Sequence, residues 1–500
     1  MQIKFGHEAL EKIKSDIVVA LATQKTKGKD DKGIAVLQKS DGGIALDKAL
    51  GGLISKIIAE EKFRGETASF RIIYSQGRIP AKMILLMGLG KTDEFSNDVL
   101  RKIGAKIASV ANDFKAKNVA GLIQPESIKG LQPYSRIQAL VEGFILGSYK
   151  FEQYKDKKDI EPDAFSESIF VFKGNPAAQQ KIRTAIDRAL LTADGVNMVR
   201  DLVNMPPKDL TPDALAKKAK EVASAAKLGC KILGPKEIKE EKMGLLLAVA
   251  KGSEHEPRFI HLSYRPSKKA KKKIALVGKG VTFDSGGYDL KPSKHMLAMK
   301  NDMAGAATCI AVMKIISALK SEIEIDAYMP ATDNMIDAKA EVPGNIIKSR
   351  RGKTVEISNT DAEGRLILAD AIDYALERKP DYIIDIATLT GGVLYALGEI
   401  YTAVLGNDQK LIEKYIKAAN ETNEPAWNLP LVKEYKKGFF GGPADISNVS
   451  KTFASTISGA LFIEEFVKDT KWLHLDIAES AWAEEERAYT PKGGTGGTVR

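Results

Sequence analysis

Hydrophobic residues in the first third of the chain alternate between short β-type runs and helical spacing. Runs rich in branched and aromatic residues predict strands at Asp16–Thr23, Ser69–Gln76 and Met83–Gly90. Apolar residues three and four positions apart predict helices at Leu46–Phe63 and Asp98–Lys117. Strands that alternate with helices in this way indicate an α/β domain.

The same alternation continues through the rest of the chain. Buried strands are predicted at Lys272–Gly278, Glu324–Ala331 and Tyr382–Thr390, with helices at Gly305–Lys320 and Arg365–Pro380. Hydrophobic strands separated by helices indicate a mainly parallel central sheet covered on both faces. In such sheets, ligands bind at the carboxyl ends of the strands.

The length of the chain indicates two domains. At 500 residues it exceeds what one hydrophobic core supports. A continuous helical pattern over Pro176–Asn204 could connect the two parts. We therefore expect a smaller N-terminal α/β domain at residues 1–180 and a larger C-terminal domain at residues 181–500.

Composition describes an ordinary globular protein, with 44% hydrophobic and 28% charged residues. The start of the chain has no apolar secretory segment, and no run approaches the ~18 apolar residues of a membrane helix. We therefore expect a cytoplasmic protein. The two cysteines, Cys230 and Cys309, exclude a disulfide framework, and no paired histidines form a zinc-binding helix. A metal site would consist mainly of oxygen ligands.

The charge balance allows a nucleic-acid partner. The net charge is +10, from 75 Lys and Arg against 65 Asp and Glu, and the densest basic cluster is Lys268–Lys273. Such a run is usually a solvated turn, here before the strand at Lys272–Gly278. DNA binding is therefore a possible additional activity.

Acidic and basic side chains gather at the predicted strand-to-helix junctions. They are Lys279, Asp284, Lys291, Asp302, Asp361, Glu363 and Arg365. Four carboxylates in one cleft could not all stay ionised without compensation, which two divalent cations ~3.5–4 Å apart would supply. A lysine beside a cation can lose its proton and coordinate it, whereas a charged lysine can polarise a carbonyl. The set predicts a two-metal-ion hydrolase.

Parts of this set also have a purely structural interpretation. Asp302 could be a helix N-cap, and DSGG at residues 284–287 could be a turn. The ordered combination is much harder to obtain by chance than any single motif. A phosphatase or nuclease would use similar carboxylates, so the class of substrate stays open at this point.

Three motifs resemble those of the leucyl aminopeptidase (cytosol aminopeptidase) family. They are VGKGVTFDSGGYDLKP at residues 277–292, MKNDMAGAA at 299–307 and NTDAEGRL at 359–366. The resemblance extends from Arg200 to the end and more weakly into the N-terminal part. It implies a macro-like N-terminal α/β domain, which we expect to serve oligomerisation or regulation. It further implies a catalytic domain with a mixed central sheet covered by helices, and a homohexamer.

The resemblance also implies which residues hold the two metals. Asp284 and Glu363 would contact both cations. Lys279 and Asp302 would complete the more tightly held site. Asp361 would hold the more exchangeable cation through its side chain and backbone carbonyl. Zn²⁺, Mn²⁺, Mg²⁺ and Co²⁺ all suit such ligands to some degree.

Lys291 and Arg365 are the implied catalytic pair. In the family, the counterpart of Arg365 holds a bicarbonate ion that acts as the general base. The free α-amine of a peptide would bind one metal, which directs cleavage to the amino terminus. A water activated by the metals would attack the first carbonyl, and Lys291 would stabilise the resulting oxyanion.

The implied substrate contacts extend beyond the metal ligands. They are Lys291, Met299, Asp302, Asp361, Thr388, Leu389 and Gly391. A Met-lined pocket, completed by the region Ala478–Ala481, suits Leu or Met side chains, although burial in the core is the alternative for Met299.

Two positions depart from the family pattern. Asp289 lies in the loop that carries Lys291, and we expect it to pair with Lys291 or to alter the metal preference. Glu479 replaces a usual glycine and would change the shape of the substrate pocket.

Overall fold

The structure, a computed structural model, describes residues 2–6, 8–25, 33–37, 42–122, 133–160, 167–171 and 176–500. Two compact units are formed, the first by Met1–Ala193 with Glu486–Pro491, the second by Asp194–Glu485 with Lys492–Arg500. The expected boundary near residue 180 falls within α5, a single helix at Pro176–Asn204. Among the described residues, no helix combines the length and apolarity needed to cross a membrane.

The first unit is built on a seven-stranded sheet in the order β1-β7-β6-β2-β5-β4, with β3 paired to β2. The strands are β1 (Gln2–Gly6), β2 (Ile17–Lys25), β3 (Ile34–Leu37), β4 (Phe70–Tyr74), β5 (Met83–Lys91), β6 (Asn118–Leu122) and β7 (Glu167–Val171). β4 and β3 pair antiparallel to their neighbours, and the other pairs are parallel.

Alternate residues of β2 point to opposite faces of this sheet. Val18 and Ala20 belong to the core beneath α1 (Gly43–Ala49) and α2 (Leu53–Glu60). Ile17 and Val19 pack with α3 (Asn97–Asp113) and α4 (Pro133–Gly147). A strand with apolar residues on both sides therefore lies at the centre of an α/β unit, as predicted.

The single helix predicted at Leu46–Phe63 is wrong. The chain breaks between α1 and α2 at Gly51 and Gly52, whose φ values are +68° and +80°. Glycine adopts this left-handed conformation without steric cost. The Asp47 carboxylate then accepts a hydrogen bond of 2.8 Å from the Ile54 backbone N–H, which caps the second helix.

The second unit contains a nine-stranded mixed sheet in the order β17-β16-β19-β15-β10-β12-β9-β8, with β11 paired to β12. The strands are β8 (Gly229–Leu233), β9 (Arg258–Tyr264), β10 (Lys273–Gly278), β11 (Gly280–Asp284), β12 (Glu324–Asn334), β15 (Tyr382–Ala387), β16 (Thr402–Gly406), β17 (Ala426–Asn428) and β19 (Lys471–Asp476). Strands β19, β15, β10 and β12 are mutually parallel at the centre. On one side β9 and β8 run antiparallel to their neighbours, and on the other β16 runs antiparallel to β19 but parallel to β17. The predicted mixed sheet with a parallel centre is confirmed.

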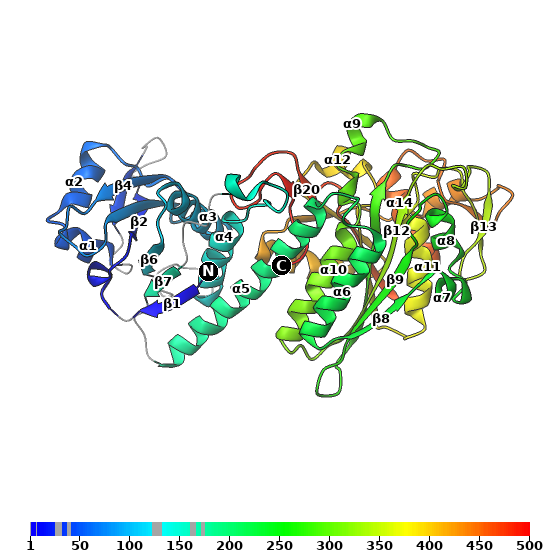
Figure 1. The fold of residues 1–500 in the computed structure, drawn as a ribbon, viewed down its shortest axis with the longest axis horizontal. Helices are drawn as coiled ribbons and strands as arrows, with labels where there is room; N and C mark the ends of the chain where they lie inside the picture. The colour runs from blue at the N-terminus through cyan, green and yellow to red at the C-terminus, as the bar shows by residue number, and fades with distance from the viewer. Residues whose placement is uncertain are drawn as a thin grey trace. The chain divides into compact units, whose positions relative to one another are not determined.

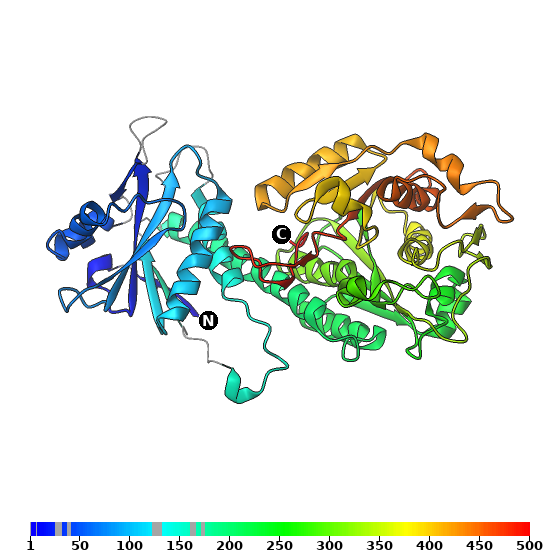
Figure 2. The ribbon, with the colours of Figure 1, turned by 90° about the horizontal axis from the view of Figure 1, so that it is seen from above.

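Helices cover both faces of this sheet (Figure 1; Figure 2). They are α6 (Pro212–Ala226) and α10 (Ala304–Ala318) on one side, and α8 (Gly244–Ala250), α11 (Gly364–Leu376) and α14 (Ser455–Val467) on the other. The other helices of the second unit are α7 (Pro235–Glu240), α9 (Ser293–Met296), α12 (Gly392–Leu397) and α13 (Gln409–Thr422), and its short strands are β13 (Ile346–Lys348), β14 (Thr354–Glu356), β18 (Ile446–Ser447), β20 (Trp482–Ala483) and β21 (Gly493–Gly494). Short 3₁₀ helices are η1 (Leu10–Lys12) and η2 (Lys157–Asp159) in the first unit, and η3 (Met299–Asn301) and η4 (Lys433–Phe439) in the second.

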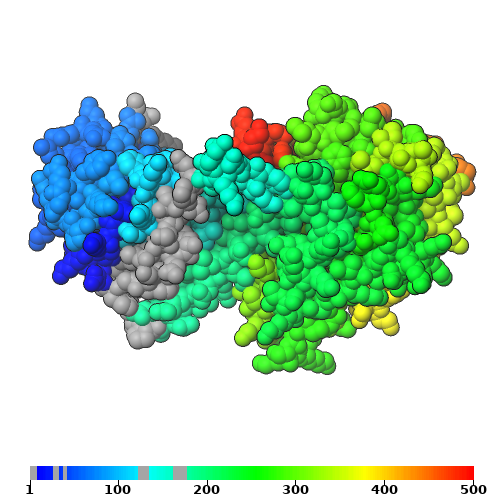
Figure 3. All heavy atoms as spheres, viewed as in Figure 1, coloured from blue at the N-terminus to red at the C-terminus, as the bar shows by residue number. Residues whose placement is uncertain are grey.

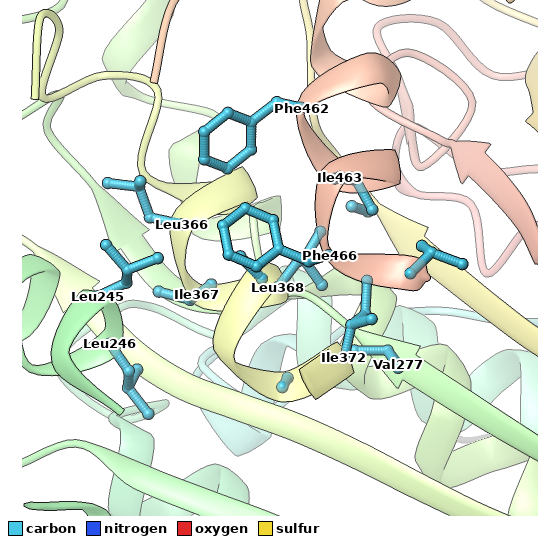
Figure 4. Packing of buried hydrophobic residues seen from close by; sticks show 14 of the residues in the cluster. Leu245, Leu246, Val277, Leu366, Ile367, Leu368, Ile372, Phe462, Ile463 and Phe466 are labelled. Carbon is cyan, nitrogen blue, oxygen red and sulfur yellow. The ribbon is translucent and has the colours of Figure 1, made fainter. Parts of the chain in front are cut away.

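Helix α11 is buried over most of its surface. Leu368 and Ile372 lie on the side of Phe466 of α14, while Leu366 and Ile367 lie toward Leu245 of α8 (Figure 4). This packing holds the first turn of α11, which follows the NTDAEGRL motif, in a defined position relative to the sheet.

Asp370 of α11 supports this position with a buried carboxylate. It accepts hydrogen bonds from the backbone N–H groups of Leu245 (2.8 Å), Leu246 (3.1 Å) and Arg350 (2.7 Å). Burial raises the pKa of Asp370 to about 7, although the three donors act in the opposite direction. Both carboxylate oxygens face donors, so the ionised form fits the geometry best.

We expect Asp370→Asn to lower the free energy of unfolding by about 1–3 kcal/mol, because an amide NH₂ would replace one acceptor opposite buried N–H groups. Urea unfolding measures this loss. Asp469→Asn, at an exposed position, is the control and should leave the midpoint unchanged. Equal midpoints for the two variants would contradict the anchoring role of Asp370.

Candidate functional site

The candidate residues meet at the carboxyl edge of the central sheet. Lys279 directly follows β10, and Thr388 directly follows β15. Because β10 pairs in parallel with both β12 and β15, these three strands end at one edge. The chain reaches the same edge at Asp302, before α10, and at Glu363, before α11.

Lys279 forms the buried half of the cluster. Its Nζ lies 2.8 Å from Asp302 Oδ1 and 2.8 Å from Glu363 Oε1, and it donates a hydrogen bond of 2.8 Å to the Thr388 carbonyl. The Thr388 hydroxyl donates to Asp302 Oδ1 at 2.6 Å. All four side chains are buried. The structure thus brings together residues that are far apart in the sequence.

Lys291 forms the more open half. Its Nζ lies 2.9 Å from Asp284 Oδ2 and 2.5 Å from Asp361 Oδ1. Asp284 Oδ1 accepts hydrogen bonds from the Gly286 N–H (2.9 Å) and from Asn334 Nδ2 (2.8 Å). Two lysines therefore lie among four carboxylates, each between two of them.

Burial and mutual repulsion work against ionisation of these carboxylates. Burial raises the pKa values of Asp284, Asp302 and Asp361, that of Asp361 to about 6, and nearby carboxylates add to the effect. For Glu363, the attraction of Lys279 and Lys291 outweighs burial, and the pKa is lowered. Burial alone would lower the pKa values of both lysines, but the surrounding carboxylates raise them.

The cluster fits divalent cations. Asp284, Asp361 and Glu363 each offer a carboxylate oxygen, and these oxygens lie within 4.8 Å of one another. Asp302 Oδ2 is buried and accepts no hydrogen bond from the residues that the structure describes. Converging oxygen ligands with unsatisfied buried charge are what hard cations require.

Arg365 is buried in the first turn of α11. Its Nη1 donates a hydrogen bond of 3.0 Å to the Asn448 carbonyl, while its Nε has no hydrogen-bond partner among the described residues. Burial lowers the pKa of Arg365 to about 10, so the group stays charged at neutral pH. A buried cation with an unused donor can hold a small anion.

The other predicted substrate residues lie outside the hydrogen bonds and ion pairs of the carboxylate cluster. The Leu389 N–H donates to Asp476 Oδ1 at 3.0 Å, which ties the loop after β15 to the end of β19. Met299 begins the turn η3 and is half-buried, and Gly391 is exposed before α12. Within the described part of the chain, no hydrogen bond or ion pair joins Met299 or Gly391 to the carboxylates.

The structure also describes Asp289 and Glu479, the two positions that depart from the family pattern. The expected pairing of Asp289 with Lys291 is wrong, because Asp289 Oδ2 instead accepts a hydrogen bond of 2.7 Å from the Thr360 N–H. Glu479 is half-buried, and burial followed by the charges of Asp476 and its acidic neighbours raises its pKa. Glu479 therefore lies in an acidic environment close to the end of β19.

Sequence reasoning missed several polar residues that support the cluster: Asn334, Thr360, Asn448 and Asp476. Asn334 and Asp476 end β12 and β19 at the carboxyl edge of the sheet, so a search of every strand end for polar residues would have found them. Asn448 directly follows β18, a strand of two residues that is too short to be predicted from the sequence.

A mixed sheet with parallel central strands, and buried carboxylates around two lysines at its carboxyl edge, is the arrangement expected of a metal-dependent hydrolase of the α/β class. The model of the cytosol aminopeptidase family, catalytic domain, matches residues 197–500, and that of the N-terminal domain matches residues 33–158. The chain therefore belongs to the cytosol aminopeptidase family and is a metalloaminopeptidase.

Similar proteins agree with this membership. The chain is 39% identical over 500 residues to a probable cytosol aminopeptidase of Alkaliphilus oremlandii, covering 100% of this chain and 98% of the relative. It is 39% identical over 455 residues to one of Geotalea uraniireducens, with 91% of each chain covered. Among solved structures, the bottromycin maturation enzyme BotP matches with a TM-score of 0.83, 29% identity and 97% coverage of both chains. BotP in complex with Mn matches at 30% identity, with the same TM-score and coverage.

Proposed function

We propose that this aminopeptidase removes apolar N-terminal residues, of the Leu or Met type, from peptides. Its two divalent cations would be held by Lys279, Asp284, Asp302, Asp361 and Glu363. The observation that supports the metal site, and with it the activity, is the convergence of carboxylate oxygens of Asp284, Asp361 and Glu363 within 4.8 Å of one another. Cations held there would supply Lewis acidity that activates water and polarises a carbonyl.

Lys291 and Arg365 would act on the substrate. Lys291 Nζ lies beside Asp284 and Asp361 at the more open side of the cluster, so its ammonium can donate to an oxygen that becomes negative in the transition state. Arg365 would hold a bicarbonate ion as general base through its unused donor. This arrangement leaves proton abstraction to a bound anion, because the carboxylates are committed to the cations.

The substrate would enter with its α-amine toward Asp302 and Asp361, which limits cleavage to a free amino terminus. Its first side chain would lie against Met299, Thr388, Leu389 and Gly391. Apolar groups from Met and Leu suit an apolar side chain. Glu479 is expected to narrow the pocket on the side of Ala478–Ala481.

The cations are proposed to be Zn²⁺ or Mn²⁺, with Mg²⁺ and Co²⁺ as alternatives. The Mn complex of the similar enzyme BotP favours manganese. We further propose a cytoplasmic homohexamer in which the N-terminal α/β domain serves assembly or regulation. An elution position of a monomer in size-exclusion chromatography would refute the hexamer.

An aminoacyl-anilide panel tests the proposed activity. Metal-depleted protein should show no hydrolysis, and Mn²⁺ or Zn²⁺ should restore it, with Leu- and Met-anilides cleaved fastest. N-acetylated Leu-anilide and a phosphate ester are controls and should stay intact. Absence of anilide hydrolysis with every cation would overturn the activity, and cleavage of the phosphate ester instead would indicate a different two-metal hydrolase.

DNA binding is proposed as an additional activity, carried by the loop between β9 and β10. This loop contains Lys268, Lys269, Lys271 and Lys272, with Lys273 at the start of β10, and it protrudes from the surface (Figure 3). Lys271, Lys272 and Lys273 form ion pairs with Glu322, Asp381 and Glu324, respectively. These pairs lower the charge available to phosphates, so a gel-shift assay at low salt is the relevant measurement. No shift at low salt would exclude this role.

A further inference from the structure

Two loops carry the groups proposed to act at the site. The first follows β11 and leads through Gly286, Gly287 and Asp289 to Lys291. The second precedes α11 and contains Thr360 and Asp361. The named residues of the two loops are 69 to 75 positions apart, and α9, α10, β12, β13 and β14 lie between the loops in the sequence. The strand β11 and the helix α11 bring the two loops to one edge of the sheet, and contacts between the loops themselves add to this placement.

Asp289 and Thr360 make these contacts in both directions. The Thr360 N–H donates to Asp289 Oδ2 at 2.7 Å, and the Asp289 N–H donates to Thr360 Oγ1 at 2.9 Å. Thr360 Oγ1 in turn donates to the Gly286 carbonyl at 2.6 Å. Thr360 is buried, so water does not replace these bonds readily.

A third residue extends the network to a carboxylate of the site. Asn334 Nδ2 lies 3.1 Å from the Thr360 carbonyl and donates to Asp284 Oδ1 at 2.8 Å. The N–H, the carbonyl and the hydroxyl of Thr360 therefore all form hydrogen bonds, and Thr360 directly precedes Asp361.

The loops also approach each other too closely for larger residues. Gly287 has a φ of +64°, and a Cβ at this position would lie 3.0 Å from Thr360 Oγ1. A Cβ on Gly286, whose φ is +89°, would lie 2.9 Å from Asp361 Oδ1. The two glycines allow the approach, and the hydrogen bonds hold it.

We propose that Asp289 and Thr360 form a clasp that positions Lys291 and Asp361 at the separation that catalysis and binding of the more exchangeable cation require. This inference rests on the proposed function of the site. Asp289 and Thr360 are positioning residues, because they act through their neighbours and not on the substrate. The clasp also assigns a role to Asp289, a residue that departs from the family pattern.

The clasp depends on the hydrogen-bond acceptor of the Asp289 side chain more than on its negative charge. Only Oδ2 takes part in the hydrogen bonds, and the residue as a whole is exposed, so its charge is well solvated. An asparagine at this position keeps one side-chain oxygen as the acceptor for the Thr360 N–H. Asp289→Asn is therefore the conservative variant, and Asp289→Ala removes the acceptor.

The test compares matched pairs by Mn²⁺ titration calorimetry of metal-depleted protein and by anilide kinetics. Asp289→Ala and Thr360→Val should each weaken the weaker of two Mn²⁺ affinities about tenfold or more and lower kcat, as loss of an outer hydrogen-bond partner does at metal sites. Asp289→Asn and Thr360→Ser keep the acceptor and the hydroxyl, so their affinities should stay within about twofold of wild type.

Each outcome decides the proposal. Unchanged Mn²⁺ affinities and kcat in Asp289→Ala would overturn it, and an equal loss in Asp289→Asn would overturn it by showing that charge is what matters. If Asp289→Ala does not fold, the Thr360→Val and Thr360→Ser pair gives the same comparison. The titration requires no turnover, so a wild-type protein that binds Mn²⁺ but cleaves no anilide would refute the proposed function separately from the clasp.

Discussion

Replacement of Glu363 by glutamine is expected to lower kcat about 10³-fold and to reduce the Mn²⁺ bound per subunit. The Glu363 carboxylate is buried, lies 2.8 Å from Lys279 Nζ and converges with Asp284 and Asp361. Metal Lewis acidity contributes several kcal/mol to stabilisation of the transition state, and about 4 kcal/mol corresponds to three factors of ten in rate. The amide keeps the shape of the side chain but removes the negative charge that holds a cation.

Anilide kinetics and metal analysis of purified protein measure these two effects. Glu421→Gln, which changes an exposed glutamate of α13, is the control and should leave both values unaltered. A Glu363→Gln variant that keeps the full metal content and wild-type kcat would remove Glu363 from the proposed ligand set.

Lys291→Ala is expected to lower kcat about 10²–10³-fold without loss of metal, which is the effect of removing one oxyanion donor. Lys291 Nζ lies between Asp284 and Asp361, so its removal leaves two carboxylates without a positive partner. Mn²⁺ affinity should consequently stay equal or increase. The two substitutions thus separate a metal ligand from a group that acts on the substrate.

Calorimetry with Mn²⁺ and single-turnover kinetics provide the measurement. Lys294→Ala, three residues further along and exposed, is the matched control. An unchanged kcat in Lys291→Ala would contradict its proposed role, and a marked loss of Mn²⁺ would indicate that Lys291 supports the cations and not the substrate.

Much of the fold follows from local patterns. The helix at Pro176–Asn204 agrees with its predicted bounds, and the strands β5, β10 and β15 begin within one residue of theirs. The break between α1 and α2 was missed although Gly51 and Gly52 mark it, because apolar spacing continued across the glycines. Hydrophobic periodicity reports which face is buried and does not report a change of direction.

Part of the candidate site could likewise be predicted from the sequence, and part could not. Lys279, Asp284, Asp302, Asp361 and Glu363 could be selected from the sequence, because several ionisable residues at strand-to-helix junctions are unusual and their chemistry is shared. The bonds of Asp289 could not be predicted. Lys291 was the closer basic residue in the sequence, but Thr360 offered a buried N–H that needs an acceptor.

The sequence by itself determined the α/β class, the set of metal-binding candidates and the resemblance to one family, because these depend on residue type and spacing. Only the tertiary structure decided which charges meet. It placed Lys279 between Asp302 and Glu363 and Lys291 between Asp284 and Asp361, and it joined the loops that carry Lys291 and Asp361 through Asp289 and Thr360. The physical reason is that these contacts join positions that are distant in the sequence and are brought together by parallel strand pairing and helix packing. Local periodicity does not report which distant segments pair.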